Sequence, residues 1–168
     1  MTPLITERQI IRPFVVEDAP FILRLLNEPS FIENIVDKGV RTLPQAEDYL
    51  RQGPLASYAT HGHGLWMVQH RVTGAPMGMC GLIKRETLPE IDLGYAFVPE
   101  FWGLGFAQEA AAACVAFGWE QLRCEGILAI VSPGNRPSIR LLEALGFVAQ
   151  GRMELAPGDE VVKYRLGA

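Results

Sequence analysis

Three kinds of feature are missing from this sequence of 168 residues. No apolar run approaches the ~20 residues of a membrane-spanning helix, and the opening residues, with acidic Glu7, contain no sustained apolar segment of the signal-peptide type. The three cysteines, Cys80, Cys114 and Cys124, match no zinc or redox spacing. We therefore expect a cytoplasmic protein with reduced thiols, no membrane partner and no metal.

An excess of positive charge is missing as well. The formal net charge is -4 at pH 7, whereas nucleic-acid-binding domains usually carry a basic face, so we expect no nucleic-acid partner. The composition, 49% hydrophobic and 20% charged, is typical of a globular protein. No internal repeat, low-complexity tract or linker divides the chain, so residues 1–168 are expected to form a single domain.

The hydrophobic patterning predicts an α+β fold of mixed α/β order. Strands are expected near residues 7–14, 65–71, 76–85, 90–98, 126–131, 147–153 and 161–166, and helices near residues 15–27, 42–50, 106–122 and 136–145. Short separators between the three central strands predict antiparallel pairing, and the helix near 106–122 predicts one strand–helix–strand crossover. Asp18 is a candidate cap for the first helix, and Thr42 with Gln45 has capping-box spacing for the second.

A pair of glycines stands where the longest helix should begin, in the stretch FVPEFWGLGFAQEAAAA. A helix interior disfavours glycine by ~1 kcal/mol relative to alanine, so Gly103 and Gly105 need a reason. One reason is a tight turn; the other is a backbone cradle for a phosphate at the open N-terminus of the helix. No Walker A lysine follows, and the full G-x-G-x-x-G pattern is absent.

A second helix start lies in SPGNRPSIRLLEALGF. Asn135 is a suitable N-cap, Pro137 suits the first turn, and Gly146 is a suitable stop. On these residues alone, Asn135 and Ser138 are explained by helix-start chemistry.

These two stretches together resemble the GNAT superfamily of acetyl-CoA-dependent N-acetyltransferases, and within it the branch similar to the RimJ/RimL ribosomal-protein N-terminal acetyltransferases. The resemblance covers nearly the whole chain, including ERQIIRPFVVEDAP at its start. It implies the GNAT fold, a twisted, mostly antiparallel sheet of about seven strands with helices on both faces. It also implies acetyl-CoA (coenzyme A) as co-substrate and a primary amine, either a protein N-terminus or a small amine, as acceptor.

The resemblance also implies which residues bind coenzyme A. The family's phosphate pattern, Gln/Arg-x-x-Gly-x-Gly/Ala, aligns with Trp102, Gly103, Leu104, Gly105, Phe106 and Ala107. Trp102 departs from the pattern, which costs a side-chain contact but keeps the amides from about Gly103 to Ala107 around the pyrophosphate. By the same analogy, Phe97 and Val98 lie on a bulged strand that presents its backbone to the pantetheine arm.

The family's Asn-x-x-(Ala/Ser) motif falls on Asn135 and Ser138. The resemblance implies that Asn135 bonds the pantetheine and that Ser138 lies near the thioester sulfur. Many members place a tyrosine four residues later to protonate the departing thiolate, but this position is Leu142 here. Ser138, directly or through water, is therefore the nearest candidate acid.

The candidate base is Asp92. Alternation along the predicted strand puts Asp92 on one face with Glu90 and Gly94, and Tyr95 on the other face, where we expect it in the core. Related sequences often carry an acidic residue that points at the acceptor site from this position. An exposed carboxylate at the strand edge is the alternative.

Several other interpretations stay open. His61 and His63 lie two apart in a glycine-rich loop, but no third metal ligand is evident nearby, so a flexible loop bordering the acceptor cleft is expected. Trp102 could be a surface lid, and a homodimer is one possible assembly. The leading function is direct acetyl transfer in a ternary complex. The alternatives are a non-catalytic acyl-CoA-binding sensor and an NAD-binding domain, the latter disfavoured by the three closely spaced strands.

Overall fold

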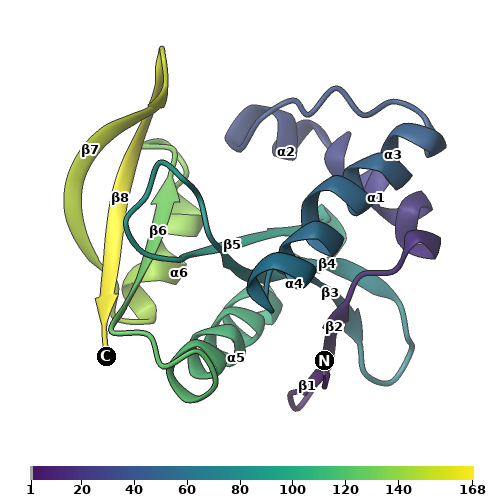
Figure 1. Ribbon diagram of the computed structural model, residues 1–168, viewed down its shortest axis with the longest axis horizontal. Helices are drawn as coiled ribbons and strands as arrows, with labels where there is room; N and C mark the ends of the chain where they lie inside the picture. Colours follow the sequence, from purple (N-terminus) through teal and green to yellow (C-terminus); the bar gives the residue numbers. More distant parts are fainter. Residues whose placement is uncertain (1) are drawn as a thin grey trace.

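A single mixed sheet with helices on both faces organises the computed structural model, which describes residues 2–168 (Figure 1). The strands are β1 (Leu4–Ile5), β2 (Gln9–Pro13), β3 (Leu65–His70), β4 (Pro76–Ile83), β5 (Asp92–Phe97), β6 (Gly126–Val131), β7 (Val148–Ala156) and β8 (Asp159–Gly167). Their spatial order is β1-β2-β3-β4-β5-β6-β8-β7, and β5 with β6 is the parallel pair among otherwise antiparallel neighbours in the described chain. This confirms the predicted α+β architecture, with the two-residue β1 as an addition to the seven strands expected.

The helices fall into two groups. They are α1 (Ala19–Leu26), α2 (Pro29–Asn34), α3 (Leu43–Leu50), α4 (Ala56–His61), α5 (Phe106–Glu120) and α6 (Arg136–Ala144), with short turns η1 (Val16–Asp18), η2 (Arg51–Leu55) and η3 (Pro99–Phe101). Figure 1 shows α1–α4 gathered on one side of the central strands, with α5 on the other. Residues between 126 and 131 return to the sheet beside β5, so α5 is the predicted crossover helix.

Each face of the sheet has its own apolar core. On one face, α1 and α3 pack on β3 and β4 through a cluster that includes Phe14, Ile22, Leu25, Leu50, Met67 and Met79. On the other face, α5 and α6 cover a cluster that includes Trp66, Leu82, Leu93, Cys114, Ile127 and Leu142. The sheet is therefore buried on both sides, and β5 contributes to both cores by alternation.

Of the two predicted helix N-caps, the structure confirms one and contradicts the other. Thr42 and Gln45 form the predicted capping box at the start of α3. Asp18 occupies the N-cap position of α1, but its side chain caps nothing there. Its carboxylate instead accepts a hydrogen bond from the Val15 N–H at 2.9 Å and pairs with Arg12 at 2.9 Å. The predicted cap was wrong because a charged partner on β2 competes for the same oxygens.

Two helices were not predicted. Pro29 has the character of a stop signal, yet it begins α2, because proline is tolerated in a helical first turn. Gly53 and Pro54 suggest a break after α3, but the chain continues from α3 to α4 through η2, a wide π-helical turn. Among residues 2–168, no helix is long and apolar enough to cross a membrane.

Candidate active site

The loop before α5 has the backbone of an anion cradle. Gly103 has φ 73° and Gly105, the N-cap of α5, has φ 81°, a region that favours glycine. The first helical bond in this region runs from the Glu109 N–H to the Gly105 carbonyl at 3.1 Å. The six backbone N–H groups of residues 103–108 donate no hydrogen bond to any acceptor within residues 2–168. Six free donors at a positive helix end suit a diphosphate.

Space around this cradle is open. An added Cβ on Gly103 would meet nothing within 4 Å, and one on Gly105 would meet only Nη2 of Arg8 at 3.4 Å. A shallow cavity of about 400 Å³ adjoins the loop and is lined by Gly105, Gln108, Glu109, Ala112 and Leu145. The cavity runs along the first two turns of α5 toward the end of α6, so a ligand bound at the loop would have room beside it.

Sequence reasoning missed Arg8, which reaches the same loop from the N-terminal region. Its Nη1 donates to the Leu104 carbonyl at 2.9 Å, and its Nε donates to Glu109 Oε1 at 2.7 Å. The guanidinium carbon lies 4.2 Å from the centre of the Phe106 ring. About a hundred residues separate these partners in the chain, so no local pattern could have found the contact.

The side chains of the predicted phosphate loop divide into exposed and buried ones. Trp102 is 52% exposed and Leu104 55% exposed, while Phe106 is buried at 6%. Trp102 Nε1 donates to the Phe97 carbonyl at 2.8 Å, so the indole fastens the loop to the end of β5. Ala107 is partly buried against the core of α5. The loop therefore offers its backbone, rather than polar side chains, to a ligand.

Strands β5 and β6 pair at one residue pair, Asp92 with Leu128, and then separate. The separation leaves the β6-facing edge of β5 without a strand partner from Leu93 onward. The β4–β5 register runs unbroken from Ile83↔Asp92 to Gly78↔Phe97, so the predicted bulge is absent from this ladder. The opening comes instead from the divergence of two parallel strands.

The backbone of β5 presents alternate residues to this opening. The Val98 N–H donates to the Met77 carbonyl at 3.0 Å, and the Val98 carbonyl accepts from the Phe101 N–H at 3.1 Å. Because hydrogen-bonded and non-bonded pairs alternate along an antiparallel ladder, Phe97 and Tyr95 direct their N–H and C=O away from β4 and toward the opening. Of the predicted pair, Phe97 therefore has its N–H on the open side, whereas both polar groups of Val98 are occupied.

The first turn of helix α6 contacts β5 through Ser138 and Tyr95. Asn135 is the N-cap of α6, and its side-chain oxygen accepts a hydrogen bond from the Ser138 N–H at 3.4 Å. The Ser138 hydroxyl forms a short hydrogen bond with the Tyr95 hydroxyl. Leu142, at the position where the resemblance implied a tyrosine in many family members, is buried, with 1% of its surface exposed. Tyr95 and Ser138 are both half-buried, so Tyr95 is more than the core residue expected.

Asp92 is fully buried at the start of β5, which overturns the alternative of an exposed carboxylate at the strand edge. Arg85 Nε donates to its two oxygens at 3.1 and 3.2 Å, and the Arg85 side chain is 36% exposed. Burial raises the pKa of Asp92 to about 6, although the Arg85 charge acts in the opposite direction. Glu90, expected beside Asp92, instead pairs with Arg165 at 2.7 Å on β8, and this pair lowers the pKa of Glu90.

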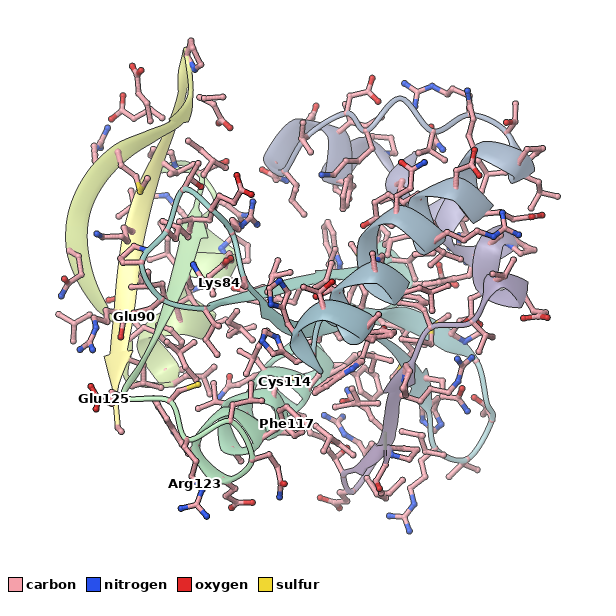
Figure 2. All side chains as sticks on the ribbon, in the orientation of Figure 1. Lys84, Glu90, Cys114, Phe117, Arg123 and Glu125 are labelled. Carbon is pink, nitrogen blue, oxygen red and sulfur yellow. The ribbon has the colours of Figure 1, made fainter. Side chains whose placement is uncertain are left out.

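The surroundings of Asp92 are basic. Lys84 Nζ donates to the backbone carbonyls of Arg85 at 2.9 Å and Leu88 at 2.7 Å. Figure 2 labels Lys84 and Glu90 along the segment that links β4 to β5, above α5 with its labelled Cys114 and Phe117. The hairpin pairing of Ile83 with Asp92 is what brings Arg85 to the carboxylate, and only knowledge of that register could have predicted the contact.

The side chains of Asp92 and Ser138 lie on opposite faces of the sheet at β5. Tyr95, the partner of Ser138, packs with the α5 core, and alternation puts Asp92 on the face that Ala96 shares with the α1 core. Past the pair Asp92↔Leu128, no ladder between β5 and β6 separates the two faces in the described chain. A thioester that enters from the α5 side and an amine that enters from the other side could meet there.

The histidine loop differs from its prediction. His63 is buried at 6%, and its Nδ1 is 2.6 Å from the Leu82 carbonyl, so it anchors the start of β3 rather than lying in a flexible loop. His61 ends α4, and its ring lies 5.8 Å from that of His63. Over the described residues, no group of three His, Cys, Asp or Glu side chains could hold a metal ion. A second cavity, of about 480 Å³, lies beside α1 and the β3–β4 hairpin, away from these residues.

Comparison with known proteins gives consistent matches. The family model described as "Acetyltransferase (GNAT) domain" matches residues 8–148. The uncharacterized protein YkkB of Bacillus subtilis is 30% identical over 86% of this chain and 84% of its own length. A crystal structure of an acetyltransferase from Agrobacterium tumefaciens superposes with a TM-score of 0.81 at 28% identity, covering 100% of this chain and 95% of that one. RimL, a ribosomal L7/L12 alpha-N-protein acetyltransferase solved in complex with coenzyme A, shares the fold at a TM-score of 0.81 and 14% identity, over 98% and 96% of the two chains.

Proposed function

Because this chain belongs to the GNAT acetyltransferase family, we propose that it transfers the acetyl group of acetyl-CoA to a primary amine by direct attack in a ternary complex. The single observation that carries the proposal is the set of six free N–H groups, residues 103–108, at the start of α5. A run of unpaired donors at the positive end of a helix suits the diphosphate of coenzyme A. The branch similar to RimJ and RimL is favoured by the shared fold.

The proposed binding residues for coenzyme A are those of the loop and the strand opening. The amides of residues 103–108 bind the diphosphate, and the absence of Cβ atoms at Gly103 and Gly105 lets it approach the backbone. The pantetheine arm runs along β5, where Phe97 offers its N–H, and past Asn135 on α6. Trp102 covers the loop end of this path, since its indole is fixed to the end of β5.

Asp92 is the proposed base. With a pKa of about 6 it is mostly ionised at neutral pH, yet basic enough to accept a proton from an ammonium group. As the nitrogen–carbon bond forms and the carbon–sulfur bond breaks, the amine proton passes to Asp92, directly or through water, and the electron pair goes to sulfur. Ser138 donates a hydrogen bond to that sulfur. Arg85 holds the Asp92 carboxylate in one orientation during this transfer.

An α-amino group is the favoured acceptor. Its ordinary pKa of ~7.7–8.0 leaves roughly a tenth of it neutral at pH 7, against far less for a lysine-like amine at ~10.4. The pKa of Asp92, about 6, lies about two units below that of an α-ammonium group and about four units below that of a lysine-like ammonium group. Proton transfer to Asp92 is therefore less unfavourable from the α-amine. A peptide N-terminus and a free amino acid both meet this requirement.

The test is a screen of amines and peptide N-termini with acetyl-CoA, read by the mass increase of the acceptor and by release of coenzyme A. Calorimetry with coenzyme A alone measures the cradle separately. Turnover with at least one α-amine supports the proposal. Tight binding of coenzyme A without turnover across the panel would favour an acyl-CoA sensor, and absence of binding would refute the cradle.

A further inference from the structure

Among residues 2–168, the Ser138 hydroxyl has one side-chain partner, the hydroxyl of Tyr95 on β5. Within the described chain, both polar contacts of the Tyr95 hydroxyl go to Ser138: a short one to Oγ and one of 3.4 Å to the backbone carbonyl. The Tyr95 hydroxyl has one hydrogen, and either hydroxyl can be the donor in the contact between the two hydroxyl oxygens. In the arrangement in which Tyr95 donates to Ser138 Oγ, the hydrogen of the Ser138 hydroxyl is free to bind a ligand.

With Tyr95 as the donor, the Ser138 hydroxyl can itself donate one hydrogen bond. Ser138 and Tyr95 are half-buried where α6 contacts β5, while Leu142, one turn further along α6, is buried and carries no donor. The Ser138 N–H is already engaged with Asn135. The hydroxyl is therefore the polar group that this turn of α6 offers to the opening.

From this geometry we infer that Tyr95 is a positioning residue for acetyl transfer, which orients the Ser138 hydroxyl so that its hydrogen points at the sulfur of the departing thiolate. The inference rests on the proposed function. The hydrogen bond with Tyr95 fixes the orientation of the Ser138 hydroxyl. A donor that is already oriented stabilises the negative charge that develops on sulfur without reorganising during the reaction.

Tyr95 keeps its proton throughout. Burial raises the pKa of Tyr95 to about 12, although its bond to Ser138 acts in the opposite direction. A thiol with a pKa of about 8.5 is a stronger acid, so the tyrosine does not protonate the thiolate. The carbon–sulfur electron pair stays on sulfur, hydrogen-bonded by Ser138, until solvent water supplies the proton. The pair Tyr95–Ser138 therefore takes the place of a proton-donating side chain at Leu142.

The test is a double-mutant cycle on turnover. Tyr95→Phe removes one oxygen and should lower kcat about tenfold, with the KM for acetyl-CoA and the Kd for coenzyme A within twofold of wild type. Ser138→Ala should lower kcat at least as much. Because Tyr95 acts through Ser138, Tyr95→Phe should lower kcat no further in the Ser138→Ala background.

Tyr58→Phe is the matched control. The Tyr58 hydroxyl donates to the Leu65 carbonyl and accepts from the Phe14 N–H at 3.1 Å, away from the opening. This variant should lose melting temperature but keep kcat. If Tyr95 were only structural, its variant would behave in the same way.

Three results would overturn the inference: unchanged kcat in Tyr95→Phe, a loss of kcat that is additive with Ser138→Ala, or a loss of coenzyme A affinity as large as the loss of kcat. Ser138→Thr keeps a hydroxyl and provides a second test that leaves Tyr95 in place. It should keep most of the turnover that Ser138→Ala loses, and equal loss in both would also contradict the inference. Failure of the proposed function differs, since the wild type would then acetylate no amine.

Discussion

The charge of Asp92 offers the sharpest test of the site, because its burial affects both activity and stability. Asp92→Asn keeps the shape of the side chain and its contact with Arg85 but removes the negative charge and the proton acceptor. The pKa of Asp92 is raised from 3.8 to about 6. Asp92 is therefore about 90% ionised at pH 7 and about 10% ionised at pH 5.

The expected pH–rate profile follows from two ionisations. With an α-amine acceptor, log kcat/KM of the wild type should rise with slope 1 between about pH 6 and 7.7, where the amine deprotonates, and with slope 2 below about pH 6, where Asp92 is also protonated. Asp92→Asn should keep the slope of 1 due to the amine, and this slope should continue below about pH 6 without rising to 2. Its turnover at neutral pH should fall by one to two orders of magnitude, with partial recovery at higher pH.

Stability gives an independent readout of the same pKa. A carboxyl group whose folded-state pKa lies above its unfolded value binds protons more tightly when folded, so its contribution to stability is present at low pH and lost as pH rises from about 3.8 to about 6. A difference of about two pH units at 1.36 kcal/mol each corresponds to about 3 kcal/mol. The unfolding free energy of Asp92→Asn minus that of the wild type should rise by up to this amount between pH 4 and pH 7.

The assays are urea unfolding at several pH values and a pH–rate profile with the best acceptor. Superimposable rate profiles would show that Asp92 is not the base. A difference in unfolding free energy that stays flat between pH 4 and pH 7 would refute the raised pKa.

Three further predictions concern the loop and its supports. Gly105→Val should weaken binding of coenzyme A at least tenfold in calorimetry, because a branched side chain at φ 81° strains the cradle. Gly74→Val, at φ 75° in the open β3–β4 turn, should leave this affinity unchanged. Ser138→Ala should lower turnover about tenfold and the melting temperature little; full turnover would return Ser138 to a helix-start role. Arg8→Ala removes the ion pair with Glu109 and the contact with α5, and should lower the free energy of urea unfolding by about 1–2 kcal/mol; an unchanged value would show that this ion pair contributes nothing.

Local patterns in the sequence predicted the parts of the site that depend on neighbouring residues. The capping box at Thr42, the N-cap at Asn135 and the glycine pair before α5 all lie where the sequence placed them. These features depend on hydrogen bonds and backbone angles within a few residues, so a single segment contains the information. The resemblance of two motifs then predicted the family, which the comparisons confirm.

Only the tertiary structure decided how the titratable and polar side chains are paired. The sequence allowed Asp92 to be exposed, but in the folded chain it is buried, and the β4–β5 register pairs it with Arg85. The sequence also suggested that Tyr95 was core, yet the approach of α6 to the strand opening brings its hydroxyl to Ser138. Such contacts join segments far apart in the chain, and the charge state of a buried group depends on the sum of its surroundings. No window of sequence contains that sum.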